Sequence, residues 1–492
     1  MKQLILILPE IFLTIVALSL LLGEAFFPGK RRLWIHCGIF SLFVAGLHQL
    51  MFLFTGAVPL ASVFGFEPSV VREAWVQYGL VFGMISIDSL AMFFKLCIIA
   101  AVIMVLWLSL EESELQDSTE MGTYTALLLF AVVGMMFLVG SVDFLMAVIA
   151  LELLSISSFI LTGFVLKRRS SSEGAIKFFL VGTLSTGILL YGISYFYGYF
   201  GTTSIDALMN LSASPYTRDL ALSVIMVFLI AGFGFKLSMA PFHMWAPDAY
   251  EAAPTPITAF LSVAPKAAAL GFLMRLFGNH AAIGLTPLLA ALAAITMTVG
   301  NLGALHQTNL KRLLAYSSIA QVGYILVAMV AGGNLGNQAV MIYTFVYIFM
   351  NMGVFSILIM VSNRQQSHDI KAFTGLYHKS FGLSIALFIF MLSLTGIPPL
   401  SGFIGKFSIF AAVVKSPDLI WLGVVAVINS VISVYYYLKV VRTMFFGDPA
   451  LSAEPFFSPA LLCCLTISLV ITLVAGIAPS PLLGWVRLVI GS

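Results

Sequence analysis

Three lysines lie inside long apolar stretches, where a chain that crosses a membrane is expected to carry no charge. They are Lys236, Lys266 and Lys406, and each has prolines or glycines close by. Placing a lysine at the centre of a bilayer costs roughly 2.5 to 3.5 kcal/mol on insertion scales, so such a residue is functional by default. Together with Glu152, the only acid well inside its own apolar run, these lysines predict a path for protons.

A break in a helix is predicted beside each lysine. Lys236 lies five residues before Pro241, and a proline in a helix interior removes one hydrogen bond and clashes with an earlier carbonyl. Pro265 directly precedes the second lysine, and its missing amide frees the carbonyl of Leu261. The third lysine follows the segment PPLSG, where glycines allow close approach of the backbone or access of water. Water and free carbonyls can then solvate an ammonium group that lipid could not.

These charges can act together as a relay. Burial lowers the pKa of a lysine and a neighbouring carboxylate raises it again, so a lysine that feels a movable negative charge can exchange a proton near neutral pH. Glu152 is the predicted counter-charge of Lys236, and their separation would send the proton on to Lys266. His243 lies in the predicted break and is of a type that titrates in the range a relay needs, whereas Lys177 is an intermediate or a local counter-charge.

Each of these residues also has a purely structural interpretation. The three lysines and the glutamate would then form static buried ion pairs that fix the register of their helices. His243 would satisfy carbonyls freed at the break, and Lys177 would extend to the nearby membrane surface. Asp88 and Asp143 lie near predicted helix ends, which favours capping. Asp88 is also the predicted partner of Lys95, two turns further along the chain.

The composition indicates a polytopic helical membrane protein. Hydrophobic residues make up 61% and charged residues only 9% of the chain, against about 25% charged in a soluble domain. Apolar runs of about 20 residues, long enough to cross a bilayer, recur along it, and strand-like alternation is absent. The net charge of +3 gives no reason to expect a nucleic-acid partner, and the four cysteines have no spacing or histidine partners suited to a metal or cluster.

About fourteen spans are predicted, which makes the fold class all-α. Prolines interrupt the seventh and the twelfth of them. The predicted extents are 3–24, 33–54, 79–109, 123–140, 143–166, 174–200, 219–245, 256–277, 284–305, 308–331, 338–361, 381–416, 419–446 and 458–479.

The two interrupted spans divide the chain into units. We predict helices 1–3 in residues 1–122, a five-helix repeat in 123–280, a second five-helix repeat in 281–446, and helix 14 with a tail in 447–492. Because each repeat has five spans, the two enter the membrane from opposite sides and form an inverted pair. Broken helices at matching positions of inverted repeats are typical of transporters with a site at mid-membrane.

Basic residues gather in alternate loops. Clusters such as 30–32, 167–169 and 311–312 fall on one side of the membrane, and few basic residues fall on the other. The positive-inside rule puts that side in the cytoplasm and both termini outside. The acidic loop EESELQDSTE lies on the same side, although acids weigh little in that rule. His306, with the basic pair 311–312, either guards the cytoplasmic exit of the path or anchors the membrane surface.

Four stretches of this chain carry a resemblance to a known family. The longest is GFKLSMAPFHMWAPDAYEAAPTPITAFLSVAPKAAA, and the others are LELLSISSF, HQTNLKRLLAYSSIAQVGY and TGIPPLSGFIGKF. Together they closely resemble the antiporter-like membrane subunits of respiratory complex I, the proton-pumping NADH:quinone oxidoreductases. The likeness covers spans 4–13 well, and the flanking spans by length and layout.

The resemblance assigns roles to the buried charges. The family's buried glutamate falls on Glu152, its broken-helix lysine on Lys236, its central relay lysine on Lys266, and the terminal group of its twelfth helix on Lys406. A lysine at the last position differs from the glutamate of the M-type subunits, and the chain ends shortly after span 14 without the lateral helix of the L-type. The N-type subunits are the best match.

The resemblance also implies an enzyme context. The chain would translocate protons as a subunit of NADH:quinone oxidoreductase, driven by quinone reduction elsewhere, and would perform no redox chemistry itself. It would hold no cofactor, because FMN, iron–sulfur clusters and quinone belong to partner subunits. Its partners would be the M-type antiporter-like subunit, the K-, J- and A-type subunits and the lateral helix of the L-type subunit, in a bacterial inner membrane; a thylakoid or organelle version would look much the same.

Two other functions are compatible with the same core residues. The first is a subunit of an Mrp-type cation/proton antiporter, with no redox enzyme attached. The second is a membrane scaffold whose lysines are locked in ion pairs, for which retained activity after removal of Lys266 would be the evidence.

Overall fold

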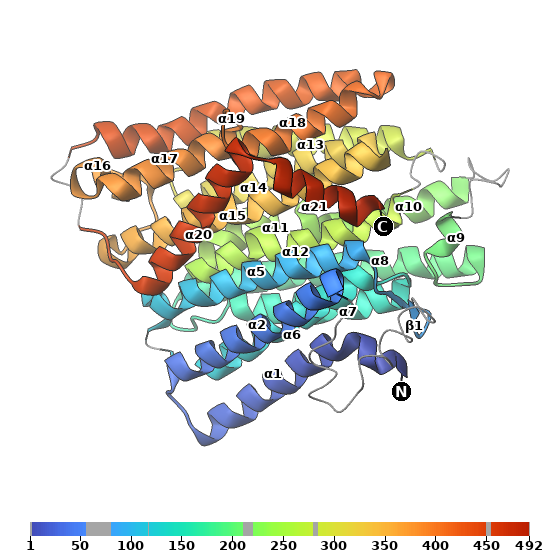
Figure 1. Ribbon diagram of the computed structural model, residues 1–492, viewed down its shortest axis with the longest axis horizontal. Helices are drawn as coiled ribbons and strands as arrows, with labels where there is room; N and C mark the ends of the chain where they lie inside the picture. The colour runs from blue at the N-terminus through green and yellow to red at the C-terminus, as the bar shows by residue number, and fades with distance from the viewer. Residues whose placement is uncertain are drawn as a thin grey trace.

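A bundle of long α-helices makes up most of the described chain. The computed structural model describes residues 2–55, 80–116, 118–209, 220–278, 284–448 and 454–491. Its helices run roughly side by side, and both ends of the chain lie on the right of the view in Figure 1. In the described part, thirteen helices are long and apolar enough to cross a membrane. Helices α17 (Phe381–Thr395) and α18 (Ser401–Val414) lie in line as one further, interrupted span, so the predicted all-α fold with about fourteen spans is confirmed.

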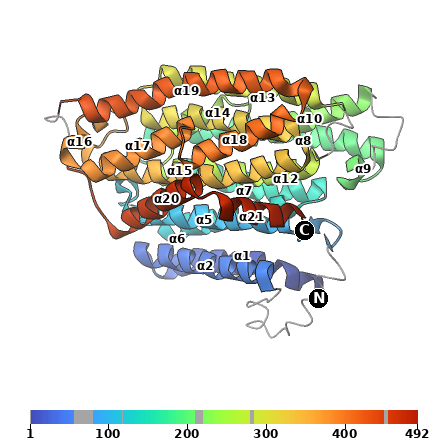
Figure 2. The ribbon, with the colours of Figure 1, turned by 45° about the horizontal axis from the view of Figure 1, so that its top comes forward.

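The N-terminal region supplies a layer on the lower side of the bundle in Figure 2. Here α1 packs against α6 (Met121–Gly140), and α2 packs against α5. A two-residue antiparallel hairpin, with Leu80 opposite Ser86, precedes α5. The elements are η1 Lys2–Ile7, α1 Leu8–Phe26, α2 Arg31–Thr55, β1 Leu80–Val81, β2 Ile85–Ser86, α5 Ser89–Glu111 and η2 Ser113–Leu115.

Two series of helices follow, and each has its interrupted helix in the fourth position. The first series is α6 Met121–Gly140, α7 Phe144–Thr162, α8 Arg169–Phe200, the short α9 Asp206–Met209, the broken pair α10 Leu220–Leu237 and α11 Trp245–Ala252, and α12 Thr255–Leu276. The second is α13 Thr286–Leu305, α14 Leu310–Ala331, α15 Gly333–Gln365, η4 Ile370–Phe373, α16 Leu376–Lys379, the broken pair α17 Phe381–Thr395 and α18 Ser401–Val414, η5 Pro417–Leu419, and α19 Ile420–Phe446. The chain then forms α20 Pro459–Ile477 and α21 Ser480–Gly491.

The sequence explains where these helices begin. A helix satisfies its own backbone groups, which is the condition for a segment to lie in lipid, but its first amides need side-chain partners. Asp88 accepts from the amide of Ala91 at the start of α5, and Asp143 accepts from that of Leu145 at the start of α7, both at 2.8 Å. The predicted capping by these two acids is therefore confirmed. Asn309 caps α14 in the same way.

The centre of the bundle is formed by α12, α14 and α15. The apolar window of α12 is wholly buried, and those of α14 and α15 are 94% buried, whereas α8 and α19 bury only a third of theirs. Polar side chains on the three central helices are therefore shielded from lipid by the surrounding helices. This is the place where charge and irregular backbone can be tolerated inside a membrane protein.

The predicted pair of Lys95 with Asp88 is wrong. Lys95 Nζ lies 2.6 Å from Glu10 Oε1 on α1, and both side chains are almost completely buried. Asp88 instead pairs with Arg275 at 2.5 Å, at the far end of α12. Burial alone would raise the pKa of Asp88, but the Arg275 hydrogen bond and charge hold it below its usual range. Both pairs join segments far apart in the chain, which spacing along one helix does not reveal.

Breaking the Lys95–Glu10 pair should destabilise the N-terminal layer. We expect Lys95→Met to cost about 3–5 kcal/mol, because it leaves a buried carboxylate without its cation. The double variant Glu10→Leu with Lys95→Met should recover most of that loss, since no buried charge then remains. Thermal unfolding of the purified assembly compares the two; a single variant no less stable than the double variant would contradict the account.

Candidate functional site

Lys236 lies in the last turn of α10, just before the first break. Its Nζ donates to Ser155 Oγ on α7 at 3.0 Å, and its side chain is 2% exposed. Glu152, almost one turn earlier on α7, lies within electrostatic range of Lys236 but accepts a hydrogen bond from Thr186 Oγ1 on α8 at 2.6 Å. The structure therefore brings the two predicted partners to one place, with neutral hydroxyls as their direct contacts.

The break between α10 and α11 is held by specific contacts. Ser238 has a positive φ of 57°, and the following Ala240–Pro241 peptide is cis. The carbonyl of Phe235, near the end of α10, accepts from Trp245 Nε1 at 3.0 Å. The amide of Ala240 donates to Thr296 Oγ1 on α13 at 3.1 Å. The irregular backbone thus finds its partners within the protein, as the apolar surroundings require.

The two secondary candidates occupy different environments. His243 is half-buried in the break, and its Nδ1 is buried without a hydrogen-bond partner among the described residues. Lys177 is about half exposed on α8, where it pairs with Glu173 at 2.8 Å and with Asp248 on α11 at 3.2 Å. Lys177 is thus tied to the outer face of the broken helix, away from the buried lysines.

Lys266 lies in the middle of α12. Its Nζ donates to Ser318 Oγ on α14 at 2.7 Å and lies 5.7 Å from the centre of the Tyr250 ring. Pro265 stands inside the helix, and the carbonyl of Leu261 that it frees accepts from the Tyr250 hydroxyl at 2.9 Å. The carbonyl predicted to be free is therefore satisfied by a side chain from α11, next to the lysine.

Lys406 lies one turn into α18, directly beside the second break. Its Nζ donates to the carbonyl of Thr395 at 2.8 Å and to Ser430 Oγ on α19 at 2.7 Å. It also lies 4.5 Å from the centre of the Tyr324 ring. The break needs Gly396, whose φ is +93° and whose missing Cβ would lie 2.7 Å from Lys406 Cδ. The end of α17 therefore solvates the ammonium with its own carbonyl.

A buried polar cluster, which the sequence reasoning missed, fills the space along α14 between these lysines. Ser318 contacts Lys266 and Tyr324 contacts Lys406, six residues or about 9 Å apart along the helix. Between them, the Tyr437 hydroxyl bonds to Ser317 and Gln321. The remaining members are Tyr343, bonded to Gln321, and the linked set Asn301, Tyr324, Asn429 and Tyr436.

None of the three lysines forms an ion pair with a carboxylate within the described residues; the ion pairs there involve other side chains. Hydroxyl and carbonyl oxygens hold the ammonium groups instead, and aromatic faces lie within about 6 Å of each. Such neutral contacts can support a lysine in either protonation state. Chemically, the arrangement is suited to the transfer of protons.

Comparison with known proteins identifies the family. Residues 141–433 match a family model described as "NADH:quinone oxidoreductase/Mrp antiporter, TM". The chain belongs to this family. The match contains all four predicted relay residues, from Glu152 to Lys406.

Curated members of the family resemble the chain over most of its length. The NADH-quinone oxidoreductase subunit N 2 of Solibacter usitatus is 41% identical over 413 residues, covering 82% of each chain. The subunit N of Trichlorobacter lovleyi is 37% identical over 487 residues, covering 97% of this chain and 95% of its own.

Two solved structures share the fold. A chain of respiratory complex I from Thermus thermophilus is 29% identical, with a TM-score of 0.78 over 97% of this chain and 98% of its own. A chain of the Mrp complex from Dietzia has a TM-score of 0.82 over 99% of this chain and 97% of its own. At 19% identity, the second likeness concerns the fold alone.

Proposed function

We propose that this chain is the N-type membrane subunit of a proton-pumping NADH:quinone oxidoreductase. Relatives named NADH-quinone oxidoreductase subunit N, at 37–42% identity, support this assignment. In this proposal other subunits hold the FMN, iron–sulfur clusters and quinone, and this chain translocates protons without redox chemistry of its own. Its neighbours would be the other antiporter-like subunits and the small membrane subunits of the complex.

The observation that carries the proposal is how the buried lysines are held. Lys95 is locked to a carboxylate, as in a structural ion pair. Lys236, Lys266 and Lys406 are equally buried but bind neutral oxygen atoms. A lysine in a carboxylate pair keeps its proton, whereas one held by neutral oxygens can release and regain it. The scaffold alternative, which needs locked pairs, is therefore disfavoured.

The contacts suggest a role for each residue. Glu152 and Lys236 form a switchable pair, in which separation removes the attraction that keeps the proton on the lysine. Lys266 is the central store, and Lys406 passes the proton on toward the far side or the next subunit. His243, half-buried beside Pro241, remains a candidate relay at the first break. The ion pairs of Lys177 favour its role as a local counter-charge.

The membrane and the orientation follow from the basic residues. We place the chain in a bacterial inner membrane, with both termini on the periplasmic side. One end of the bundle, called the basic end here, would then face the cytoplasm. It carries Arg31, Arg168, Lys311 and Lys439.

The alternative function is a cation/proton antiporter, and wild-type activity distinguishes the two. Membranes from a strain that lacks this chain are compared with membranes in which it is restored. We expect restoration to bring back NADH-driven proton uptake together with quinone reduction. Sodium–proton exchange that returns without NADH, with quinone reduction unchanged, would instead assign the chain to an antiporter.

A further inference from the structure

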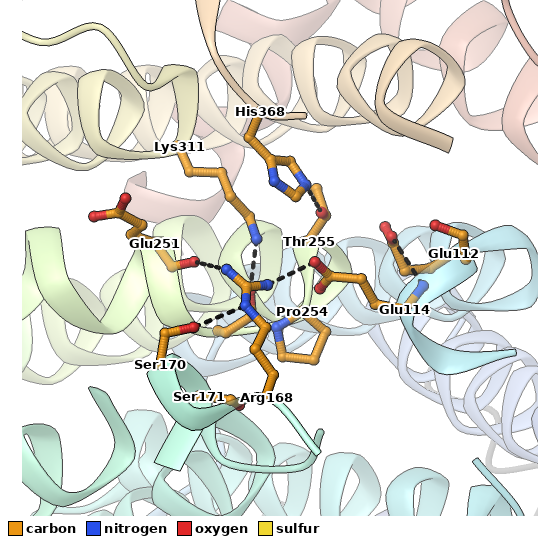
Figure 3. Close-up of polar contacts among 12 residues, drawn as sticks. Glu112, Glu114, Arg168, Ser170, Ser171, Glu251, Pro254, Thr255, Lys311 and His368 are labelled. Carbon is orange, nitrogen blue, oxygen red and sulfur yellow. Dashed lines mark hydrogen bonds and ion pairs between the residues drawn. The ribbon is translucent and has the colours of Figure 1, made fainter. Parts of the chain in front are cut away.

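A group of charged side chains at the basic end is left unexplained by the relay. Figure 3 shows Lys311 and Glu114 pointing toward Arg168, with Glu112 to one side. Glu112 directly follows α5, and Lys311 is the second residue of α14. Glu112 is 1% exposed and Lys311 is fully buried, although both belong to the end of the bundle and not to its middle.

These two buried charges are not used to neutralise each other. Lys311 Nζ donates to the carbonyl of Ala253 at the end of α11, at 2.7 Å. The Glu112 carboxylate has only neutral hydrogen-bond donors, the amide of Glu114 at 3.5 Å from Oε1 and the side chain of Thr255. Its Oε2 is buried without a partner in good hydrogen-bond geometry among the described residues. A buried carboxylate oxygen without a partner costs free energy, so its retention calls for a function.

The surrounding contacts fix the loop but leave Glu112 free to change its charge. Arg168 forms an ion pair with Glu114 at 2.6 Å and donates a hydrogen bond to the carbonyl of Glu251 at 3.2 Å. Arg31 on α2 donates to the carbonyl of Glu112 at 3.3 Å, which holds the backbone and not the carboxylate. The carboxylate is therefore positioned without being committed to a cation.

The same helices carry this group and the contacts of the central lysine. Lys311 bonds to Ala253, three residues after Tyr250, whose ring faces Lys266. On α14, Lys311 is seven residues from Ser318, the partner of Lys266, which is about 10 Å along the helix. Two helices thus connect the basic end directly to Lys266.

We propose that Glu112 and Lys311 form the intake site of the relay, where Glu112 accepts a proton from water at the basic end and Lys311 passes a proton on toward Lys266. The inference rests on the proposed function. In the cycle, the Glu112 carboxylate takes up a proton from water and becomes a carboxylic acid. It then gives this proton to the neutral amine of Lys311 and is a carboxylate again. The resulting ammonium gives the proton to the Lys266 amine through water, so charge and protons balance at every step.

The electrostatics of the site match this alternation. Burial and the charge of Glu114 together raise the pKa of Glu112 to about 7, against the opposing effects of the Lys311 charge and of hydrogen bonds from the Glu114 amide and Thr255. Near neutral pH, Glu112 therefore exists in both protonation states. Burial and the charges of Lys311 and Arg168 lower the pKa of His368 to about 2, so this histidine stays neutral and carries no proton. Besides Glu114 and Arg168, the titratable groups that act on Glu112 or Lys311 are Arg31, Tyr124 and Glu251.

The test uses proton pumping and NADH:quinone turnover of the assembled enzyme in membranes, measured across the neutral pH range. We expect Glu112→Gln to slow pumping about 100-fold, the size of a lost proton-transfer group, and to abolish any inflection near pH 7. Glu112→Asp should restore part of the rate. Glu111→Gln is the matched control, because Glu111 is partly exposed and outside the group, and it should leave pumping unchanged.

Lys311→Arg separates proton transfer from structure. Arginine keeps the positive charge but does not release its proton, so pumping should fall while the enzyme still assembles. Wild-type pumping in either Lys311→Arg or Glu112→Gln would overturn the intake site. Lys266→Ala in the same membranes tells the two proposals apart: if it stops pumping while the Glu112 and Lys311 variants do not, only the intake site is wrong. If Lys266→Ala also leaves pumping intact, the relay itself fails.

Discussion

Lys266→Ala should abolish proton pumping and leave the complex assembled. The side chain is the central store of the relay, and losing a positioned proton carrier costs about 100-fold or more in rate. Its removal leaves no buried charge unpaired, since no carboxylate binds it among the described residues. Ser318, its hydrogen-bond partner, also donates to the carbonyl of Ala315 at 2.8 Å and stays satisfied. The stability cost is therefore limited to the lost packing.

The measurement combines pumping with the amount of assembled enzyme in the same membranes. Lys266→Arg is the informative companion, because it keeps the charge and fills the space but cannot act as a proton donor. Both variants should fail to pump. Collapse of the assembly in the alanine variant, or normal pumping in the arginine variant, would make Lys266 a structural residue.

Gly402→Ala should disrupt the packing of α17 against α18 at the second break and displace Lys406. A Cβ at Gly402 would lie 1.8 Å from the carbonyl oxygen of Ser393, a backbone atom that cannot move aside without shifting α17 against α18. The Gly402 amide also donates to Ser393 Oγ at 3.0 Å, so this contact would be strained too. Overpacking in a core costs about 1–3 kcal/mol, and we expect a loss at the upper end of that range or beyond.

A matched control exists on the same interrupted helix. Gly382 is exposed near the start of α17, and a Cβ there would meet nothing within 4 Å. Gly382→Ala should be neutral or slightly stabilising, because alanine favours a helix by about 1 kcal/mol over glycine. Thermal unfolding of the two purified variants gives the comparison; equal stability would show that the close approach of α17 and α18 is not needed.

The sequence predicts the breaks and their lysines because proline and lysine each carry a strong physical constraint. A proline frees a defined carbonyl, and the freed carbonyl of Leu261 is found next to Lys266. The donor that satisfies it, Tyr250, could not be predicted, because it comes from a separate helix. The contact of Lys236 with Ser155, with Glu152 turned toward Thr186, is likewise set by the rotation of α7 and α8. Apolar helices carry little sequence signal for that rotation.

The polar cluster along α14 was missed although it left a trace. Ser317, Gln321 and Tyr324 recur every three to four residues, which puts them on one face of a helix. The tyrosines that complete the cluster lie on α15 and α19, and within apolar spans they look like packing residues.

Glu112 was overlooked for a different reason. It belongs to an acidic loop whose sequence predicts exposure, but in the fold it is buried among segments far apart in the chain, including the loop around Arg168.

The central claim is that Lys236 lies on a proton path coupled to quinone reduction. The direct test measures proton pumping and quinone-reductase activity in membranes carrying Lys236→Ala beside wild type, with assembly checked in both. The account predicts that pumping and quinone reduction fall together while the complex remains assembled. Quinone reduction that is untouched while cation exchange falls would contradict it and assign the chain to an antiporter.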